Sequence, residues 1–417
     1  MKYKILLLLV FYPFFNAGAQ DKDYAISVVD TLTSPSMHGR GYVDDGNRIA
    51  AGFIKKEFKK AKLKHFGKDY FQPFSYPMNT FPDTIDVFVD ENRLVPGRDF
   101  VIYSSSPSVD GTFQMVWALK DTAGNLTFPE GVDLQKLTEK VLVTDAGPRK
   151  FDYEKYKAKG YVFLKEGGIW WHVSDGTSVL PYFRLLISKD KISPENKLLK
   201  IKAVNSFYDA FPTQNIIGYV KGKVHPDTFL VFTAHYDHLG QMGPEAYFPG
   251  GNDNASGTAM MLDLARYFSD KHNRPDYSVV FMAFSGEEAG LLGSFYYVNH
   301  PLFPLSQIKF LINIDMVGSG SDGIKVVNGS VFKNDFDRMV KLNDEKHYLK
   351  KVSPRGAAAN SDHFPFYDKG VPSFFIYTLG DECKEYHNIY DTPKNVPYTE
   401  YDDLFRLLTD FMRSFSQ

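Results

Sequence analysis

The chain has 417 residues, of which 43% are hydrophobic and 24% are charged. These values are typical of a globular protein with one to three domains. The formal net charge of −2 argues against a nucleic-acid-binding protein, because phosphate binding normally requires a basic surface. The single cysteine, Cys383, excludes a disulfide within the chain, so the core must supply the stability.

The first residues have the pattern of an export signal. Lys2 and Lys4 precede an apolar run over residues 5–15, and small residues up to Ala19 suit cleavage. The run is shorter than a membrane-spanning helix requires. We therefore expect residues 1–19 to be a signal peptide. The mature protein would be periplasmic or extracellular, with no stable insertion into a membrane.

The chain then changes its pattern twice. Residues 23–64 show two helical apolar stripes, separated by a loop at 34–42 that contains Pro and Gly. This loop either connects two surface helices or approaches the active site. Residues 92–204 instead show short strands between turns, which predicts a mostly β domain. We expect it to be inserted into a catalytic domain formed by residues 20–91 and 205–417.

The expected inserted domain contains three adjacent aromatic residues, Trp170, Trp171 and His172. Neighbouring tryptophans can form a platform for a substrate. A tryptophan can equally serve as a buried anchor of the core. The sequence leaves both roles open.

From Asn215 onward, apolar strand patterns alternate with amphipathic helices. Strands are expected over residues 228–234, 278–283, 309–315, 323–327 and 373–377, and helices over 256–269, 288–299, 333–347, 363–368 and 400–414. This alternation predicts an α/β fold with a mixed, mostly parallel central sheet and helices on both faces. Ligands of such sheets bind beyond the carboxyl ends of the strands.

Metal-ligating residues stand where these apolar segments end. His235 follows Leu-Val-Phe-Thr-Ala, Glu287 and Glu288 follow Val-Val-Phe-Met-Ala-Phe-Ser-Gly, and Asp315 follows Phe-Leu-Ile-Asn-Ile. Asp253 lies in a Gly-rich turn before a predicted helix. Buried charges are costly unless they are paired or bound to metal. The mixture of carboxylates and imidazole suits Zn²⁺, and the cluster predicts part of a two-metal hydrolase site.

A second histidine is needed from further along the chain. The candidates are His363, in Asn-Ser-Asp-His-Phe, and His387, in Glu-Tyr-His-Asn-Ile. Spacing alone does not choose between them.

Together the motifs resemble those of the co-catalytic di-zinc aminopeptidases. These are the bacterial leucyl aminopeptidase and aminopeptidase S type, related to glutamate carboxypeptidase II and glutaminyl cyclase. The motifs run from about residue 215 to the C-terminus in the family's order: His-x-Asp, Asn-Asp-(Asn)-Ala-Ser-Gly, Gly-Glu-Glu-x-Gly-Leu-x-Gly-Ser, Asn-x-Asp-Met-x-Gly, Ser-Asp-His and Tyr-His-x-x-x-Asp-Thr. The resemblance implies a secreted zinc exopeptidase that removes N-terminal residues from peptides.

The resemblance also implies two Zn²⁺ ions and a ligand set. Asp253 would bridge both ions. His235 and Asp315 would complete the shell of one ion, while Glu288 and His387 would complete the other. The choice of His387 as a ligand rests on this resemblance.

The remaining site residues receive roles in the same way. Glu287 would be the general base that activates the attacking water, and Tyr386 would polarise the scissile carbonyl. Asp237 would orient the first histidine ligand through its other ring nitrogen. Asp362 and His363 would line the site or support the ligands.

Other activities share this metal core. The same residues could serve a carboxypeptidase or dipeptidase, for which Arg355 is one candidate substrate anchor, or a cyclase-like acyl transferase with one zinc. The presence of all five family ligands favours two ions and hydrolysis over the cyclase and over a non-catalytic binding module. The position of residues 92–204 resembles that of a protease-associated domain in several family members.

Overall fold

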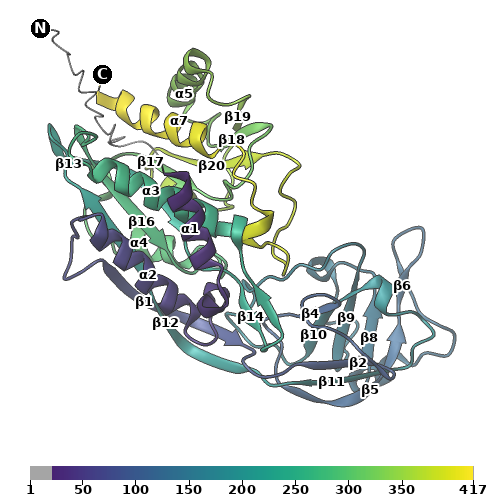
Figure 1. The fold of residues 1–417 in the computed structure, drawn as a ribbon. Helices are drawn as coiled ribbons and strands as arrows, with labels where there is room; N and C mark the ends of the chain where they lie inside the picture. The colour runs from purple at the N-terminus through teal and green to yellow at the C-terminus, as the bar shows by residue number, and fades with distance from the viewer. Residues whose placement is uncertain (1–20, 417) are drawn as a thin grey trace, which may run out of the picture.

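The computed structural model describes residues 21–416, so the predicted signal peptide and its cleavage site at Ala19 lie outside the described residues. The described chain forms two lobes, each built on an eight-stranded sheet (Figure 1). Within residues 21–416, no helix combines the length and the apolar character needed to cross a membrane.

The first sheet has the order β1-β12-β16-β13-β17-β20-β18-β19. Its strands are β1 (Phe71–Thr80), β12 (Ser206–Val220), β13 (His225–His235), β16 (Tyr277–Phe284), β17 (Ile308–Ile314), β18 (Gly323–Val327), β19 (Val352–Arg355) and β20 (Ser373–Leu379). The central strands β16, β13, β17 and β20 run parallel, whereas β1, β12 and β18 pair antiparallel with their neighbours in the order β1-β12-β16 and β20-β18. The predicted mixed α/β sheet is confirmed.

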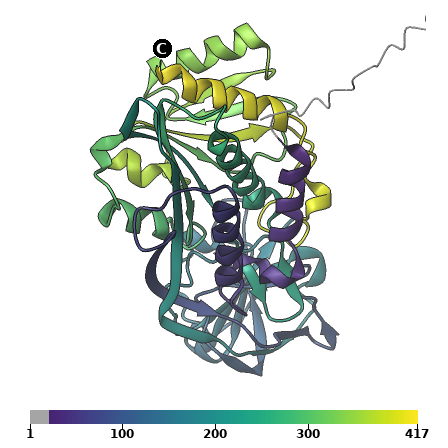
Figure 2. The ribbon, with the colours of Figure 1, turned by 60° about the vertical axis from the view of Figure 1, so that its left-hand side comes forward.

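Helices cover both faces of this sheet (Figure 2). One face packs against α1 (Lys22–Leu32), α2 (Gly46–Lys60), α3 (Gly257–Ser269), α5 (Lys333–Lys346) and α7 (Tyr401–Arg413), and the other against α4 (Leu292–Asn299) and α6 (His363–Asp368). The alternation along β13 explains the two layers. Leu230 and Phe232 point into the first core, whereas Val231 joins Tyr297 of α4 and Phe366 of α6 in the second.

The helix expected from Glu288 begins four residues later, at Leu292. The backbone takes positive φ values at Gly286 (76°), Gly290 (110°) and Leu291 (61°), which a helix cannot accommodate. A turn therefore separates β16 from α4. It holds Glu287 and Glu288 beyond the end of the strand.

The second sheet has the order β3-β2-β11-β5-β8-β9-β10-β4, and its hydrophobic core also takes in residues of other segments, among them Leu239, Met242 and Phe248. Its strands are β2 (Asp86–Val89), β3 (Asn92–Arg93), β4 (Phe100–Ile102), β5 (Val109–Trp117), β8 (Val141–Thr144), β9 (Gly160–Lys165), β10 (Phe183–Ser188) and β11 (Leu198–Ala203). Strand β2 pairs with β11 although it lies before residue 92, where the inserted domain was expected to begin. Strand β10, which was not predicted, pairs parallel to β9.

A ribbon of two strands links the lobes. Strands β1 and β12 pair antiparallel from Phe71 opposite Ile216 to Thr80 opposite Ser206, and they run from the first sheet toward the second lobe (Figure 1). Two short hairpins complete the strands, β6 (Leu119–Lys120) with β7 (Leu126–Thr127), and β14 (Gly240–Met242) with β15 (Ala246–Phe248).

Candidate metal centre

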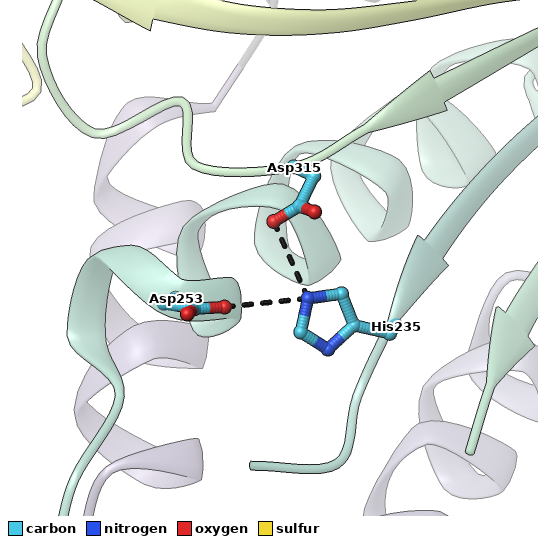
Figure 3. A group of neighbouring side chains, drawn as sticks. All are labelled: His235, Asp253 and Asp315. Carbon is cyan, nitrogen blue, oxygen red and sulfur yellow. Dashed lines mark hydrogen bonds and ion pairs between the residues drawn. The ribbon is translucent and has the colours of Figure 1, made fainter. Parts of the chain in front are cut away.

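Three predicted ligands meet at one edge of the first sheet (Figure 3). His235 ends β13, Asp315 directly follows β17, and Asp253 lies in the turn Gly251–Ser256 that precedes α3. The Nε2 atom of His235 lies 3.3 Å from Oδ1 of Asp253 and 3.3 Å from Oδ1 of Asp315. All three side chains are buried. They meet because the neighbouring strands β13 and β17 are parallel and end at the same edge.

A second group faces the other oxygen of Asp253. The Nε2 atom of His387 lies 3.0 Å from Oδ2 of Asp253 and 3.1 Å from Oε2 of Glu288. Burial opposes ionisation of Asp253, but hydrogen bonds with both histidines hold the pKa of its carboxyl well below its ordinary value. Asp253 thus presents one oxygen to each group, which is the geometry of a carboxylate that bridges two metal ions.

Both histidines have a backbone carbonyl beside their second ring nitrogen. Nδ1 of His235 lies 3.2 Å from the carbonyl oxygen of Asp237, and Nδ1 of His387 lies 3.0 Å from that of Trp171. A proton on each Nδ1 would be donated to the carbonyl, which leaves the lone pair of Nε2 directed at the carboxylates. This arrangement of nitrogen and oxygen donors fits Zn²⁺.

The carboxylate of Asp237 fixes the turn that carries the two glutamates. It accepts hydrogen bonds from the backbone N–H groups of Glu287 (3.2 Å) and Glu288 (3.3 Å), and it lies 3.8 Å from Nδ1 of His235. The nearer partner of that nitrogen is the backbone carbonyl of Asp237, rather than the carboxylate that the resemblance implied. Burial raises the pKa of Asp237 to about 6. This residue therefore contacts both the histidine and the glutamate turn.

The adjacent glutamates have opposite pKa shifts. Burial and the nearby negative charge of Glu288 raise the pKa of Glu287 well above its ordinary value. Burial also opposes ionisation of Glu288, but contacts with His387 and His238 outweigh it and lower the pKa to about 2. Two carboxylates with separated pKa values suit a proton acceptor next to a permanently ionised ligand.

His238 is a site residue to which the sequence assigned no ligand role. It is fully buried, and its Nδ1 lies 2.7 Å from Oε1 of Glu288. Its Nε2 has no hydrogen-bond partner within residues 21–416. Donor atoms of His238, Asp253 and Glu288 all lie within 4.8 Å of one another. The only sequence signal was its position three residues after His235.

Arg40 is the second residue that the sequence did not single out. Its guanidinium is fully buried and donates to five backbone carbonyls, those of Leu32 (3.1 Å), Tyr236 (2.8 Å), Pro249 (2.7 Å), Gly250 (2.9 Å) and Asp253 (3.2 Å). The loop at 34–42 therefore approaches the candidate site, which was one of the two roles left open. Arg40 ties this loop to the turn that carries Asp253 and to the residue after His235.

Two further polar side chains form hydrogen bonds with proposed ligands or with the backbone that carries them. Asp391 accepts hydrogen bonds from the backbone N–H groups of Asn252 (2.8 Å) and Asp253 (3.0 Å), and burial raises its pKa to about 7. The hydroxyl of Ser361 donates to Oδ2 of Asp315 at 2.7 Å. Both residues belong to motifs quoted from the sequence, but spacing did not reveal which atoms they contact.

The other predicted site residues lie around this centre. The ring of Tyr386 stacks on His387 with 3.8 Å between the ring centroids. Asp362 accepts a hydrogen bond from the hydroxyl of Ser294 at 2.5 Å, and burial raises its pKa to about 7. His363 is buried beside Phe375, with ring centroids 5.3 Å apart. It is therefore His387 that lies against Asp253 and Glu288.

The second lobe reaches the centre through one loop. Trp171 is buried, and its indole N–H donates to the carbonyl of Ile102 at 2.7 Å. Its backbone N–H donates to the carbonyl of His387 at 2.8 Å, in addition to the contact with Nδ1 of that histidine. Trp171 is thus a buried anchor, whereas Trp170 and His172 on either side of it are exposed.

Comparison with known proteins connects this site to one family. Residues 215–412 match the model of peptidase family M28. The chain is 33% identical over 214 residues to aminopeptidase YwaD of Bacillus subtilis, which covers 47% of this chain and 42% of that protein. It is 29% identical over 225 residues to a glutamate carboxypeptidase 2 homolog of Caenorhabditis elegans, covering 46% of this chain and 28% of that one. The matched segment spans less than half of either relative.

One solved structure has a similar fold over nearly the whole chain. BSAP, a zinc aminopeptidase from Bacillus subtilis, superposes with a TM-score of 0.71 over 94% of both chains, at 21% identity. The likeness extends over both lobes and is one of fold.

Proposed function

We propose that the chain is a zinc-dependent exopeptidase that removes N-terminal residues from peptides, because residues 215–412 match the model of peptidase family M28. The observation that carries the proposal is the geometry of Asp253, whose two carboxylate oxygens face two separate groups of histidine and carboxylate. Five residues would hold two Zn²⁺ ions: His235, Asp253, Glu288, Asp315 and His387.

Two zinc ions in this site would act as Lewis acids and make water a nucleophile near neutral pH. The side chains of the chain would perform the proton transfers. Glu287, which lies beside the proposed ligand Glu288, would take a proton from the attacking water and return it to the leaving amine. The stacking of Tyr386 on His387 supports a hydrogen bond from its hydroxyl to the oxygen of the scissile carbonyl.

Export and a protease-associated-like role for the inserted domain belong to the same proposal. The pattern of residues 1–19 supports secretion. The second sheet, most of which comes from residues 92–204 together with β2, supports an inserted domain over about these residues. Export is tested by determining the N-terminus of the protein recovered from outside the cytoplasm, and cleavage near Ala19 is the expected result.

A panel of substrates tests the activity. Peptides with a free N-terminus and the same peptides blocked by acetylation are offered to the purified protein, with and without a chelator. We expect hydrolysis of the free peptides only, its loss with the chelator, its recovery with added Zn²⁺, and two zinc ions per chain by metal analysis. Activity on blocked peptides alone would contradict the aminopeptidase assignment, and cyclisation of N-terminal Gln with one zinc per chain would favour the acyl transferase.

The carboxypeptidase alternative receives no support from Arg355. A pocket for a substrate carboxylate needs arginine side chains directed into the site. Arg355 lies on β19, is exposed, and donates to the hydroxyl of Tyr377 at 3.4 Å.

A further inference from the structure

Three aromatic side chains lie together beside His387, and we call them the aromatic surface: Trp170, His172 and Tyr386. The ring centroid of Trp170 is 6.0 Å from that of His172 and 6.4 Å from that of Tyr386. The ring of His172 is 4.8 Å from that of His387. Residues of both lobes therefore form one surface that begins next to a proposed metal ligand.

The loop of the second lobe alternates between buried and exposed residues. Trp171 and Val173 are buried, whereas Trp170 and His172 are exposed. The hydrogen bonds of Trp171 to Ile102 and to His387 fix the loop against both lobes. Trp170 remains exposed to solvent, whereas the ring of His172 faces the candidate centre, with its Nδ1 atom 3.1 Å from Nδ1 of His387. The aromatic surface is thus held rigidly relative to the candidate centre, and a rigid surface loses little entropy when a ligand binds.

Trp170 keeps a large part of its indole in contact with solvent. The side chain is 44% exposed, although a tryptophan gains from removal of its apolar area from water. On the side of its own lobe, Nζ of Lys165 lies 5.0 Å from the ring centroid. An exposed, preorganised indole next to a catalytic centre is suited to bind an apolar group.

We propose that the aromatic surface is a substrate subsite for the side chain of the N-terminal residue, which is the residue released by hydrolysis. The subsite would favour large apolar side chains, and aromatic ones above all. The proposal rests on the proposed peptidase function. The assignment to a residue beside the scissile bond follows from two distances. The ring centroid of His172 lies 4.8 Å from that of the proposed ligand His387, and a peptide advances only about 3.5 Å per residue. The first sheet would then supply the chemistry and the inserted lobe part of the specificity.

The test compares substrates that differ only in this side chain, Phe against Ala. We expect Trp170→Ala to lower kcat/KM for the Phe substrate relative to the Ala substrate by about tenfold, mainly through KM, which corresponds to about 1.4 kcal/mol. Trp170→Phe should retain most of the preference, and His172→Ala should reduce it. The matched control is Leu198→Ala, an apolar side chain of the same lobe that is 42% exposed, and it should leave the ratio unchanged.

Binding without turnover gives a second readout. Calorimetry on the zinc-loaded Glu287→Gln protein should show tighter binding of Phe-Ala-Ala than of Ala-Ala-Ala, and addition of Trp170→Ala should remove most of that difference. An unchanged Phe-to-Ala ratio in folded Trp170→Ala and His172→Ala proteins would overturn the subsite. If the parent protein cleaves neither substrate, it is the proposed function that fails, which separates the two failures.

Discussion

The two lobes have sheets of equal strand number but different strand ends. In the first sheet, the parallel strands β13 and β17 lead directly into the buried residues His235 and Asp315. In the second sheet, the parallel strands β9 and β10 end at Lys165 and Ser188, which are partly exposed and belong to no metal-ligating group found within residues 21–416. Parallel topology therefore creates a place for a site, and a site forms only where the strands end in ligands.

The two lobes also have different roles at the candidate centre. The first lobe holds all five proposed ligands, whereas the second contributes one loop that fixes His387 and carries exposed aromatic rings. Substitutions of comparable residues in the two lobes test this division.

The largest expected effect is that of Glu287→Gln. The amide cannot accept the proton from water, so kcat should fall by about 10²- to 10⁴-fold, while zinc content and thermal stability stay close to those of the parent. In the second lobe Glu166, which forms an exposed ion pair with Lys189, provides the control. Glu166→Gln should leave kcat unaltered, because exposed pairs contribute little. Equal losses of kcat in both variants would remove the division between the lobes.

Arg40→Lys should have the next largest effect. An ammonium group has three donors and cannot reach the five carbonyls that the guanidinium serves. Each buried acceptor left without a partner costs about 1–3 kcal/mol, so chemical denaturation should show a loss of at least about 3 kcal/mol, together with reduced zinc content. Arg184→Lys, which removes the guanidinium that pairs with Asp175 in the second lobe, should lower stability without lowering zinc content. Full zinc content in Arg40→Lys would contradict its role in positioning Asp253.

A pH effect distinguishes the cores of the two lobes. Asp263 of α3 accepts hydrogen bonds from the N–H of Asp21 and the hydroxyl of Tyr401, and burial raises its pKa to about 6. The folded state then binds a proton more tightly than the unfolded state, so this residue lowers stability as pH rises from about 4 to 6, by about 3 kcal/mol in total. Asp263→Asn should flatten the stability curve of the metal-free protein over that range.

The opposite sign is expected for Asp99 in the second lobe. Burial opposes its ionisation, but the guanidinium of Arg98 and the N–H of Val95 lower its pKa below the ordinary value. It therefore contributes stability above the unfolded pKa, and this contribution is lost as pH falls through the folded pKa. Asp99→Asn should reduce the loss of stability on acidification. Denaturation curves at several pH values give the slope of the free energy of unfolding against pH for the parent and for each variant. Asp263→Asn and Asp99→Asn should change this slope in opposite directions, and changes of equal sign would contradict the environments described.

The smallest effect is expected for Trp171→Phe. The ring remains large enough to fill most of its space, but the hydrogen bond to Ile102 is lost and the loop beside His387 loosens. Zinc affinity, measured by competition with a chelator, should fall by about tenfold, as is typical when the support of a metal-bound histidine is weakened. Unchanged affinity would show that the second lobe does not help to hold that ligand.

The site residues that could be predicted from the sequence are those that follow apolar runs. His235, Asp315 and the pair Glu287 and Glu288 could be located because a charged residue after a buried strand marks the carboxyl edge of a sheet. The alternation of strands and helices likewise predicted the α/β class. Both signals are local, since they depend on the side-chain periodicity of single elements.

Only the tertiary structure brought distant segments together. Spacing left His363 and His387 open, and the fold places His387 against Asp253 and Glu288. The hydrogen bonds of Arg40 and the contacts of Trp171 could not be predicted from the sequence either. Arg40 donates to the carbonyl of Asp253, 213 residues away in the sequence, and Trp171 donates to that of Ile102, 69 residues away. A carbonyl has the same chemistry at every position. The identity of such a partner is decided by the path of the whole chain.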